Sequence, residues 1–173
     1  MSETAPTIWT PELVAIIRRQ FTLDWRGIHG AGHWSRVRTI GLRLAASTGA
    51  NAAVVEYFSL LHDSRRQNDG YDHGHGLRAA EYATELRSTE VREAWIRLGD
   101  ADFERLTLAL GGHSDGELSD DATVQTCWDA DRLDLGRVGI VPDPKYLGTR
   151  AARDPAMIDW AYERSVAADR VRR

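Results

Sequence analysis

The chain has 173 residues, of which 42% are apolar and 28% are charged, a composition typical of one globular domain and not of a disordered segment. Its single cysteine, Cys127, excludes an intrachain disulfide framework and favours a reducing compartment. No stretch approaches the ~18 apolar residues of a membrane span, and the N-terminal MSETAPTIWT lacks the basic and apolar regions of a secretory signal. The formal net charge of −4 gives no indication of a nucleic-acid surface. We therefore expect a cytoplasmic protein with no nucleic-acid or membrane partner.

The spacing of apolar residues predicts eight helices along the chain. Thr10 is a good N-cap for a first helix that begins at Pro11, and Asn51 can cap the third. Gly49 ends the second helix. The predicted helices cover about 11–21, 31–47, 52–63, 76–87, 90–98, 100–110, 119–135 and 155 into the basic tail at 170–173.

Signals for β-strands are nearly absent, and the only weak candidate is 137–141. The fold class is therefore all-α, with one domain. An N-terminal helix and loop cover 1–28, a core covers 29–140, and a C-terminal loop and helix at 141–173 are expected to pack on the same domain. Long irregular stretches at 22–30, 64–76, 111–118 and 136–150 are typical of functional loops.

The distribution of histidine and aspartate over these helices is the informative feature. His33, His62, His113 and Asp131 each lie three, four or seven positions from apolar residues of their own helices, which places them on buried faces. His75 lies at a helix start. Taken singly, such a histidine is more often a core residue bonded to a carbonyl, and such an aspartate is more often a cap or an arginine partner.

The joint pattern favours a metal site. A buried carboxylate without a partner costs several kcal/mol, so buried aspartates require positive charge nearby, from arginine or from a metal. Imidazole and carboxylate groups that converge on one point favour a divalent transition metal.

The order of these residues is His33, then the pair His62-Asp63, then Asp131. This order resembles the HD-domain superfamily of metal-dependent phosphohydrolases, whose pattern is H…HD…D, and the resemblance covers about 29–140. The local contexts are similar as well: HWSRV at 33–37, LLHDS at 60–64 and DADRLD at 129–134. The resemblance implies an HD-domain-like helical bundle with an HD-type metal-binding core.

The resemblance further implies that one divalent ion (Mn, Fe, Ni, Co, Mg or Zn) is held by His33, His62, Asp63 and Asp131. The family pattern places its last ligand at Asp131 and not at the neighbouring Asp129 or Asp134, and the helical-face argument selects the same residue.

His75 and His113 fall where binuclear members of the superfamily carry extra ligands, so one or two metals per chain are expected. The His-His pair and Gly-Tyr-Pro signature of the cyclic-dinucleotide phosphodiesterases are missing. His29, four residues before His33, is expected behind the ligands, and His73 is expected to be a solvated loop residue.

The expected function is hydrolysis of a phosphomonoester, nucleotide or phosphodiester by a metal-activated water, which Asp63 could also orient. Arg66, three residues after Asp63, is the best candidate for binding phosphate, and Arg132, Arg137 and Lys145 are further candidates. The expected partner is a small phosphorylated substrate, such as a nucleotide. Two alternatives stay open: a diiron oxygenase on the same scaffold, and a non-catalytic nucleotide-binding regulatory module.

Overall fold

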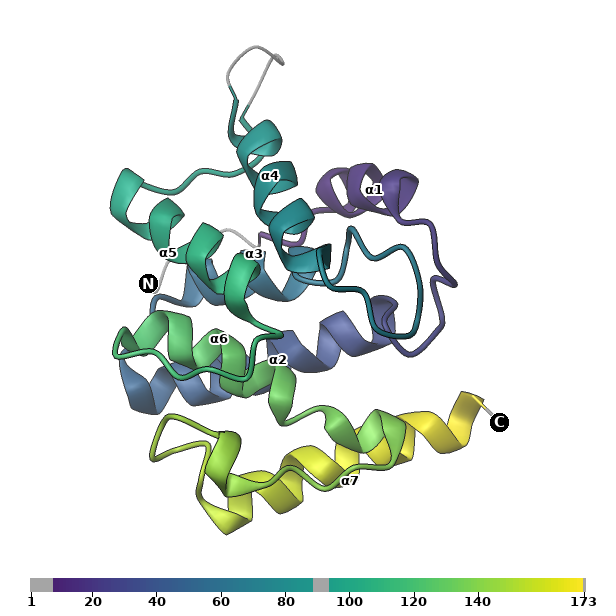
Figure 1. Ribbon diagram of the computed structural model, residues 1–173, viewed down its shortest axis with the longest axis vertical. Coiled ribbons are helices and arrows are strands. Elements are labelled where there is room, and N and C mark those ends of the chain that lie inside the picture. The colour runs from purple at the N-terminus through teal and green to yellow at the C-terminus, as the bar shows by residue number, and fades with distance from the viewer. Residues whose placement is uncertain (1–7, 89–93, 173) are drawn as a thin grey trace, which may run out of the picture.

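The computed structural model describes residues 8–88 and 94–172, and this part of the chain contains helices and loops but no strand (Figure 1). The elements are α1 (Pro11–Gln20), α2 (Ala31–Thr48), α3 (Ala52–Leu61), α4 (His75–Arg87), α5 (Asp100–Gly112), α6 (Ala122–Arg132), the short 3-10 helices η1 (Leu135–Val138) and η2 (Pro144–Tyr146), and α7 (Pro155–Arg172). The predicted all-α fold and single domain are therefore confirmed.

Local sequence signals explain where most helices begin and end. The hydroxyl of Thr10 accepts a hydrogen bond from the Leu13 N–H, and the side chain of Asn51 caps α3 in the same way, as predicted. Gly49 ends α2 with φ 74°, a conformation that favours glycine. Asp121 caps α6, so this helix begins at Ala122 and not at 119 as predicted.

Two predicted elements differ from the structure. Of the helix expected at 90–98, residues 90–93 lie outside the described part, and 94–98 is irregular. Tertiary hydrogen bonds account for this, because the Tyr57 hydroxyl donates to Trp95 O and accepts from Arg97 N. The weak strand candidate at 137–141 is wrong: it begins inside η1, which ends at Gly139 with φ 79°.

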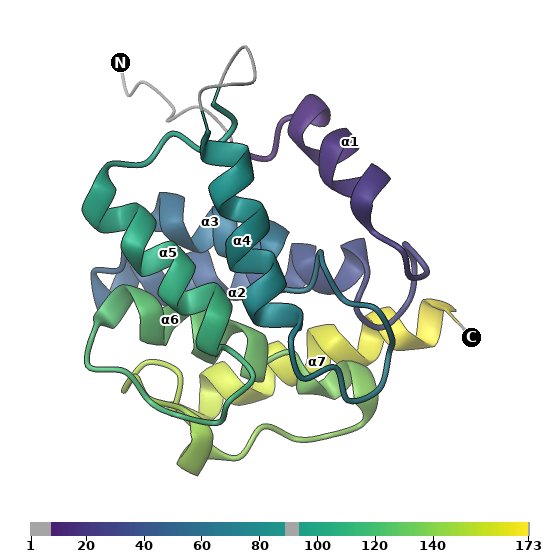
Figure 2. The ribbon, with the colours of Figure 1, turned by 45° about the horizontal axis from the view of Figure 1, so that its top comes forward.

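The helices pack so that α2 lies against both α3 and α6, while α4 pairs with α5 (Figure 2). α3 also contacts α5 and α6, and α7 covers η1 and part of α2. Gly41 permits the close approach of α2 to α3 and α6, because a Cβ there would lie 2.5 Å from Val55 Cγ1 and 3.3 Å from the Cβ of Ala130. The helices that carry His33, His62 and Asp131 are therefore held close together.

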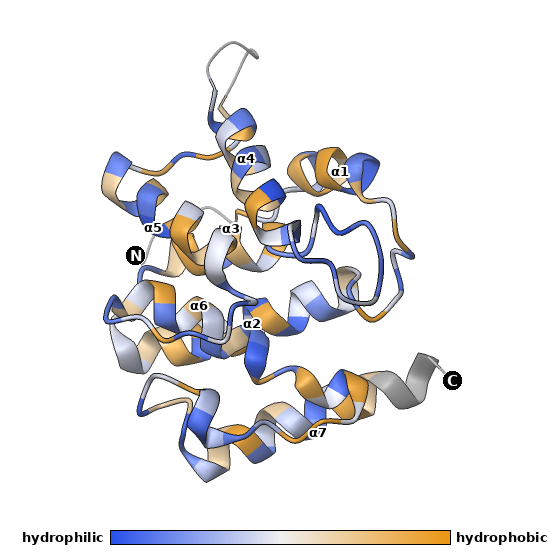
Figure 3. Cartoon of the chain, in the orientation of Figure 1, coloured by the Kyte–Doolittle hydropathy of each residue, from blue (hydrophilic) through white to orange (hydrophobic). Residues whose placement is uncertain are grey.

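Each helix carries both apolar and polar residues, whereas the loop between α3 and α4 is mostly hydrophilic (Figure 3). The core includes the fully buried side chains of Ile17, Trp34, Phe58, Leu106 and Leu110. In the described part of the chain, no helix combines the length and the apolar character that crossing a bilayer requires.

Candidate metal centre

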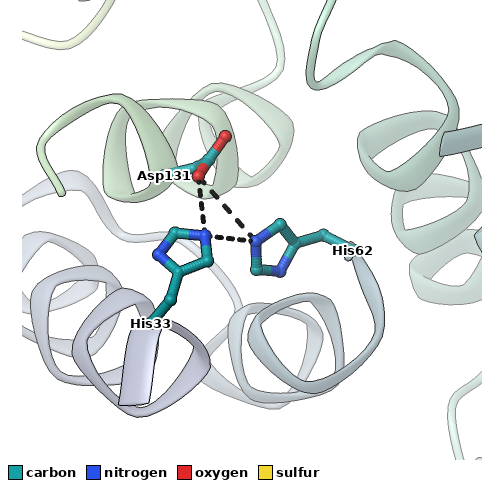
Figure 4. A group of neighbouring side chains, drawn as sticks. All are labelled: His33, His62 and Asp131. Atoms are coloured by element: carbon teal, nitrogen blue, oxygen red, sulfur yellow. Dashed lines mark hydrogen bonds and ion pairs between the residues drawn. The ribbon is translucent and has the colours of Figure 1, made fainter. Parts of the chain in front are cut away.

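Three donors from three different helices meet at one point (Figure 4). His33 lies in the first turn of α2, His62 directly follows α3, and Asp131 lies in the last turn of α6. The Nε2 atoms of His33 and His62 are 2.9 Å apart, and they lie 3.2 Å and 3.8 Å from Asp131 Oδ1. We call His33, His62 and Asp131 the first triad.

A second group of donors lies beside the first. It consists of Asp63, His75 at the start of α4 and His113 at the end of α5. The Nε2 atoms of His75 and His113 are 2.8 Å apart, and they lie 3.4 Å and 3.8 Å from Asp63 Oδ1. We call these three residues the second triad.

Asp63 connects the two triads through its two carboxylate oxygens. Its Oδ1 faces His75 and His113, whereas its Oδ2 lies 3.4 Å from His33 Nε2 and 3.6 Å from His62 Nε2. The side chain is only 3% exposed. A carboxylate in this position can bind one cation with each oxygen.

The Nδ1 atom of each of these histidines is already committed to a hydrogen-bond acceptor. His33 Nδ1 donates to Asp134 Oδ2 at 2.7 Å. His62 Nδ1 faces the carbonyl oxygens of residues 58 and 59. His75 Nδ1 donates to Asp72 O at 2.6 Å, and His113 Nδ1 donates to the carbonyl of residue 110 at 2.8 Å. A neutral ring with its proton on Nδ1 has a bare lone pair on Nε2.

This arrangement fits a metal ion. Two bare Nε2 lone pairs that face each other at 2.8–2.9 Å repel unless a proton or a metal cation lies between them. Histidines that bind metals characteristically donate their other N–H to a carbonyl or a carboxylate, as all four do here. The buried histidine and aspartate side chains could therefore hold a metal ion.

Each facing pair of imidazoles contains one ring with a raised pKa and one with a lowered pKa. Burial and a nearby guanidinium oppose the charged form of His33, but the surrounding carboxylates raise its pKa to about 9. Burial lowers the pKa of His62 to about 3 despite the neighbouring Asp63. In the second triad, burial lowers the pKa of His75, whereas contact with Asp63 outweighs burial and raises the pKa of His113. Without a metal ion, one ring of each pair therefore favours the protonated form and the other ring favours the neutral form.

The carboxylates are held in their charged form. Burial would raise the pKa of Asp63, but the imidazoles around it lower that pKa well below its usual range. The pKa of Asp131 is lowered in the same way by His33 and His62, against the effect of its burial.

Arg66 contacts the centre directly. Its Nε donates to Asp63 Oδ1 at 2.8 Å, and its Nη1 donates to the carbonyls of Asn68 and Gly70. Arg137 is buried nearby, where its Nε donates to Ile28 O and its Nη1 to Asp134 O. Arg66 therefore contacts the second triad, whereas Arg137 bonds to Asp134 behind the first triad.

The other two basic side chains that were predicted to bind substrate, those of Arg132 and Lys145, lie elsewhere. Arg132 donates to Glu117 O at 2.7 Å and to Tyr146 O at 2.8 Å, so its guanidinium joins two loops. The Lys145 side chain is 64% exposed and is paired with Asp143 at 2.9 Å. Neither of them contacts a triad residue within the described ranges, because Arg132 and Lys145 extend from α6 and η2 toward these other partners.

The two remaining histidines differ in their surroundings. His29 lies behind the first triad, with its ring centroid 6.5 Å from that of His33, and its Nδ1 is 2.8 Å from Asp69 Oδ1. This contact and the bond from Thr22 to Arg66 O hold the loop at 62–74 against the loop at 21–30 (Figure 2). His73 is exposed and contacts the Tyr71 hydroxyl.

A cavity of about 310 Å³ opens beside the second triad. Its lining residues are Arg66, Gly70, Tyr71, Asp72, His73, His75, Ser114 and Asp115. His75 of the second triad and Arg66, which contacts Asp63, both line this cavity.

Sequence reasoning considered Asp134 only as a rival ligand and did not identify the bond that it makes with His33. Asp72 was not singled out at all, although its carboxylate binds Arg78 and the backbone N–H of Gln67 while its carbonyl holds His75. The Asp-x-x-Asp spacing was the available signal for Asp134. Comparisons with protein-family models, with curated proteins and with solved structures gave no match.

Proposed function

We propose that this protein is a metal-dependent hydrolase of small phosphate esters that uses two divalent cations. One observation carries the proposal: four imidazole Nε2 atoms face one another in two pairs, and the two oxygens of Asp63 lie between the pairs. The order of these ligands along the chain, which resembles the HD-domain superfamily, supports the same function.

The donor set narrows the choice of metal. His33, His62, Asp131 and one oxygen of Asp63 would hold the first cation. His75, His113 and the other oxygen of Asp63 would hold the second. Imidazole-rich sites suit Mn, Fe, Co, Ni and Zn better than Mg, which prefers oxygen ligands. When bound, such cations supply a hydroxide nucleophile at neutral pH and polarise phosphoryl oxygens.

The protein's own residues would bind and orient the substrate. The cavity of about 310 Å³ lies at the lower end of the usual range for ligand pockets, about 300–1,000 Å³, which suits a small phosphate ester. Arg66 lines this cavity and contacts Asp63. Its guanidinium can therefore hold an anionic oxygen next to the cations, since arginine is always charged and binds phosphate well.

The test starts with the metal content of the purified protein, followed by phosphate release from p-nitrophenyl phosphate, bis(p-nitrophenyl) phosphate and nucleoside monophosphates with each of Mn²⁺, Fe²⁺, Co²⁺, Ni²⁺, Zn²⁺ and Mg²⁺. We expect close to two cations per chain and phosphate release. Asp63→Ala should abolish hydrolysis while the chain stays largely folded, and Asp129→Asn is the control because Asp129 contacts no triad residue in the described structure.

Three results would contradict the proposal. A wild-type protein that binds no cation would leave the triads as a buried polar cluster. Cation binding with oxygen consumption but no phosphate release would indicate the oxygenase alternative. Full hydrolysis by Asp63→Ala with its cations still bound would place the chemistry elsewhere.

A further inference from the structure

We infer that Asp134 is the positioning residue of the first triad, which fixes the ring of His33 so that Nε2 points at the cation. Asp134 lies just after α6 and is fully buried, so it cannot touch a substrate and acts only through His33. The inference rests on the metal-binding part of the proposed function and not on hydrolysis.

Every acceptor position of the Asp134 carboxylate is used. Oδ2 accepts from His33 Nδ1 at 2.7 Å and from Arg36 Nη2 at 3.0 Å. Oδ1 accepts from Arg36 Nε at 2.7 Å and from Ser165 Oγ at 2.5 Å. Arg36 of α2 and Ser165 of α7 both donate to the carboxylate. Its orientation therefore does not depend on the hydrogen bond from His33.

His33 differs from the other three histidines in the kind of acceptor that its Nδ1 meets. His62, His75 and His113 each donate to a backbone carbonyl three or four residues earlier. The carbonyl of Gly30, three residues before His33, accepts from the backbone N–H groups of His33 and Trp34 and not from the ring. A carboxylate 101 residues further along the chain supplies the acceptor instead.

A charged acceptor has a further consequence for the bound cation. A carboxylate that accepts from the Nδ1–H of a ligating imidazole makes the ring a stronger donor to the metal, and loss of such a partner typically costs about 10–100-fold in metal affinity. An asparagine at 134 would present an N–H₂ group either to His33 Nδ1 or to Arg36. The first orientation would favour the ring tautomer that carries its proton on Nε2, and the second would leave His33 with a neutral acceptor that is weaker than the carboxylate.

The chain offers a matched control. Asp129 is also fully buried, and its carboxylate accepts hydrogen bonds from the Gln125 amide, the Gly148 N–H, and the N–H and hydroxyl of Thr149. Asp129→Asn therefore disturbs a buried carboxylate of the same kind without touching a histidine of either triad.

The experiment is a Zn²⁺ titration of the wild type, Asp134→Asn and Asp129→Asn, combined with NMR of the imidazole Nδ1–H protons of the Zn²⁺-loaded proteins. We expect Asp134→Asn to weaken one of the two Zn²⁺ sites about 10–100-fold and to shift the low-field Nδ1–H resonance of His33. The other site and the other histidine resonances should stay as in the wild type, and Asp129→Asn should keep both affinities.

If Asp134→Asn does not fold, Ser165→Ala removes one donor to the carboxylate. The carboxylate then accepts more strongly from His33 Nδ1, so the His33 resonance should shift in the direction opposite to that expected for Asp134→Asn. A folded Asp134→Asn with wild-type Zn²⁺ affinity and an unchanged His33 resonance overturns the inference, as does an unfolded Asp134→Asn together with an unchanged resonance in Ser165→Ala. A wild type that binds no Zn²⁺ contradicts the proposed metal centre itself, so the two failures are distinguishable.

Discussion

Replacement of Gly76 by alanine tests the close approach of α4 and α5 that brings the second triad together. A Cβ at Gly76 would lie 2.5 Å from Leu110 O and 2.9 Å from Gly111 O, whereas ordinary contact begins at 3.4 Å. Both oxygens belong to the backbone, so no side-chain rotation relieves the clash. The helices would have to separate by about 0.9 Å, the difference between 3.4 and 2.5 Å.

The expected cost follows from two opposing effects. Overpacking of a tight contact costs about 1–3 kcal/mol, and alanine recovers up to about 1 kcal/mol of helix propensity relative to glycine. Because both clashing atoms are backbone oxygens, we take the upper part of the overpacking cost, about 2–3 kcal/mol, and a net loss of about 1–2 kcal/mol in the free energy of unfolding remains. Gly76 is adjacent to His75, so the separation would also widen the His75–His113 pair, and cation stoichiometry should fall from two to one.

Urea unfolding of the metal-free protein, followed by circular dichroism, measures the loss in the free energy of unfolding independently of any cation. Gly111→Ala is the control, because a Cβ there meets only Leu77 Cδ2 at 3.6 Å, and the change should stabilise α5 by about 0.4–1 kcal/mol. A Gly76→Ala protein as stable as the wild type would refute the packing argument.

Three further predictions concern the cations, the substrate and pH. A chelator should lower the melting temperature by roughly 5–10 °C per site, since saturation at about 100 times Kd contributes about 2.7 kcal/mol; an unchanged melting temperature would argue against bound metal. Arg66→Ala should raise KM for a phosphate ester by about 1.5–3 kcal/mol of binding, or about 10–150-fold, with little change in metal content, and unaltered kinetics would remove Arg66 from substrate binding. The metal-free protein should be most stable near pH 6.5. The pKa of His33 is raised from 6.5 to about 9, so its contribution is complete below pH 6.5 and is lost as pH rises toward 9. The pKa of His62 is lowered from 6.5 to about 3, so the unfolded chain takes up a proton first and stability falls as pH drops below 6.5. The His75–His113 pair acts in the same two directions, and a flat profile of unfolding free energy from pH 5 to 8 would contradict these assignments.

Helical periodicity was enough to predict the all-α fold, because apolar stripes and local caps such as Thr10 and Asn51 act within a few residues. The same stripes placed His33, His62 and Asp131 on inward faces, and the structure brings these side chains together. Periodicity describes one helix at a time, however, and contacts between distant segments are invisible to it.

Asp134 illustrates this limit. Its partners Arg36 and Ser165 lie 98 and 31 residues away in the sequence, and its position depends on the turn between α6 and η1. The irregular segment at 94–98 has the same origin, since the Tyr57 hydroxyl competes there with helical hydrogen bonds. Arg132 and Lys145 were predicted to bind substrate because they come soon after Asp131 in the sequence. In the structure, Arg132 donates to loop carbonyls and Lys145 pairs with Asp143.

The wide spacing of the donors along the chain bears on the order of events during folding. His33 and His62 are separated by 29 residues, His75 and His113 by 38, and His33 and Asp134 by 101. The first triad is complete only after α2, α3 and α6 have docked, and such non-local contacts form late. A cation that binds only the assembled triads would leave the rate of folding nearly unchanged and would slow unfolding. Metal supply would then govern the lifetime of the native protein and not the speed at which it forms.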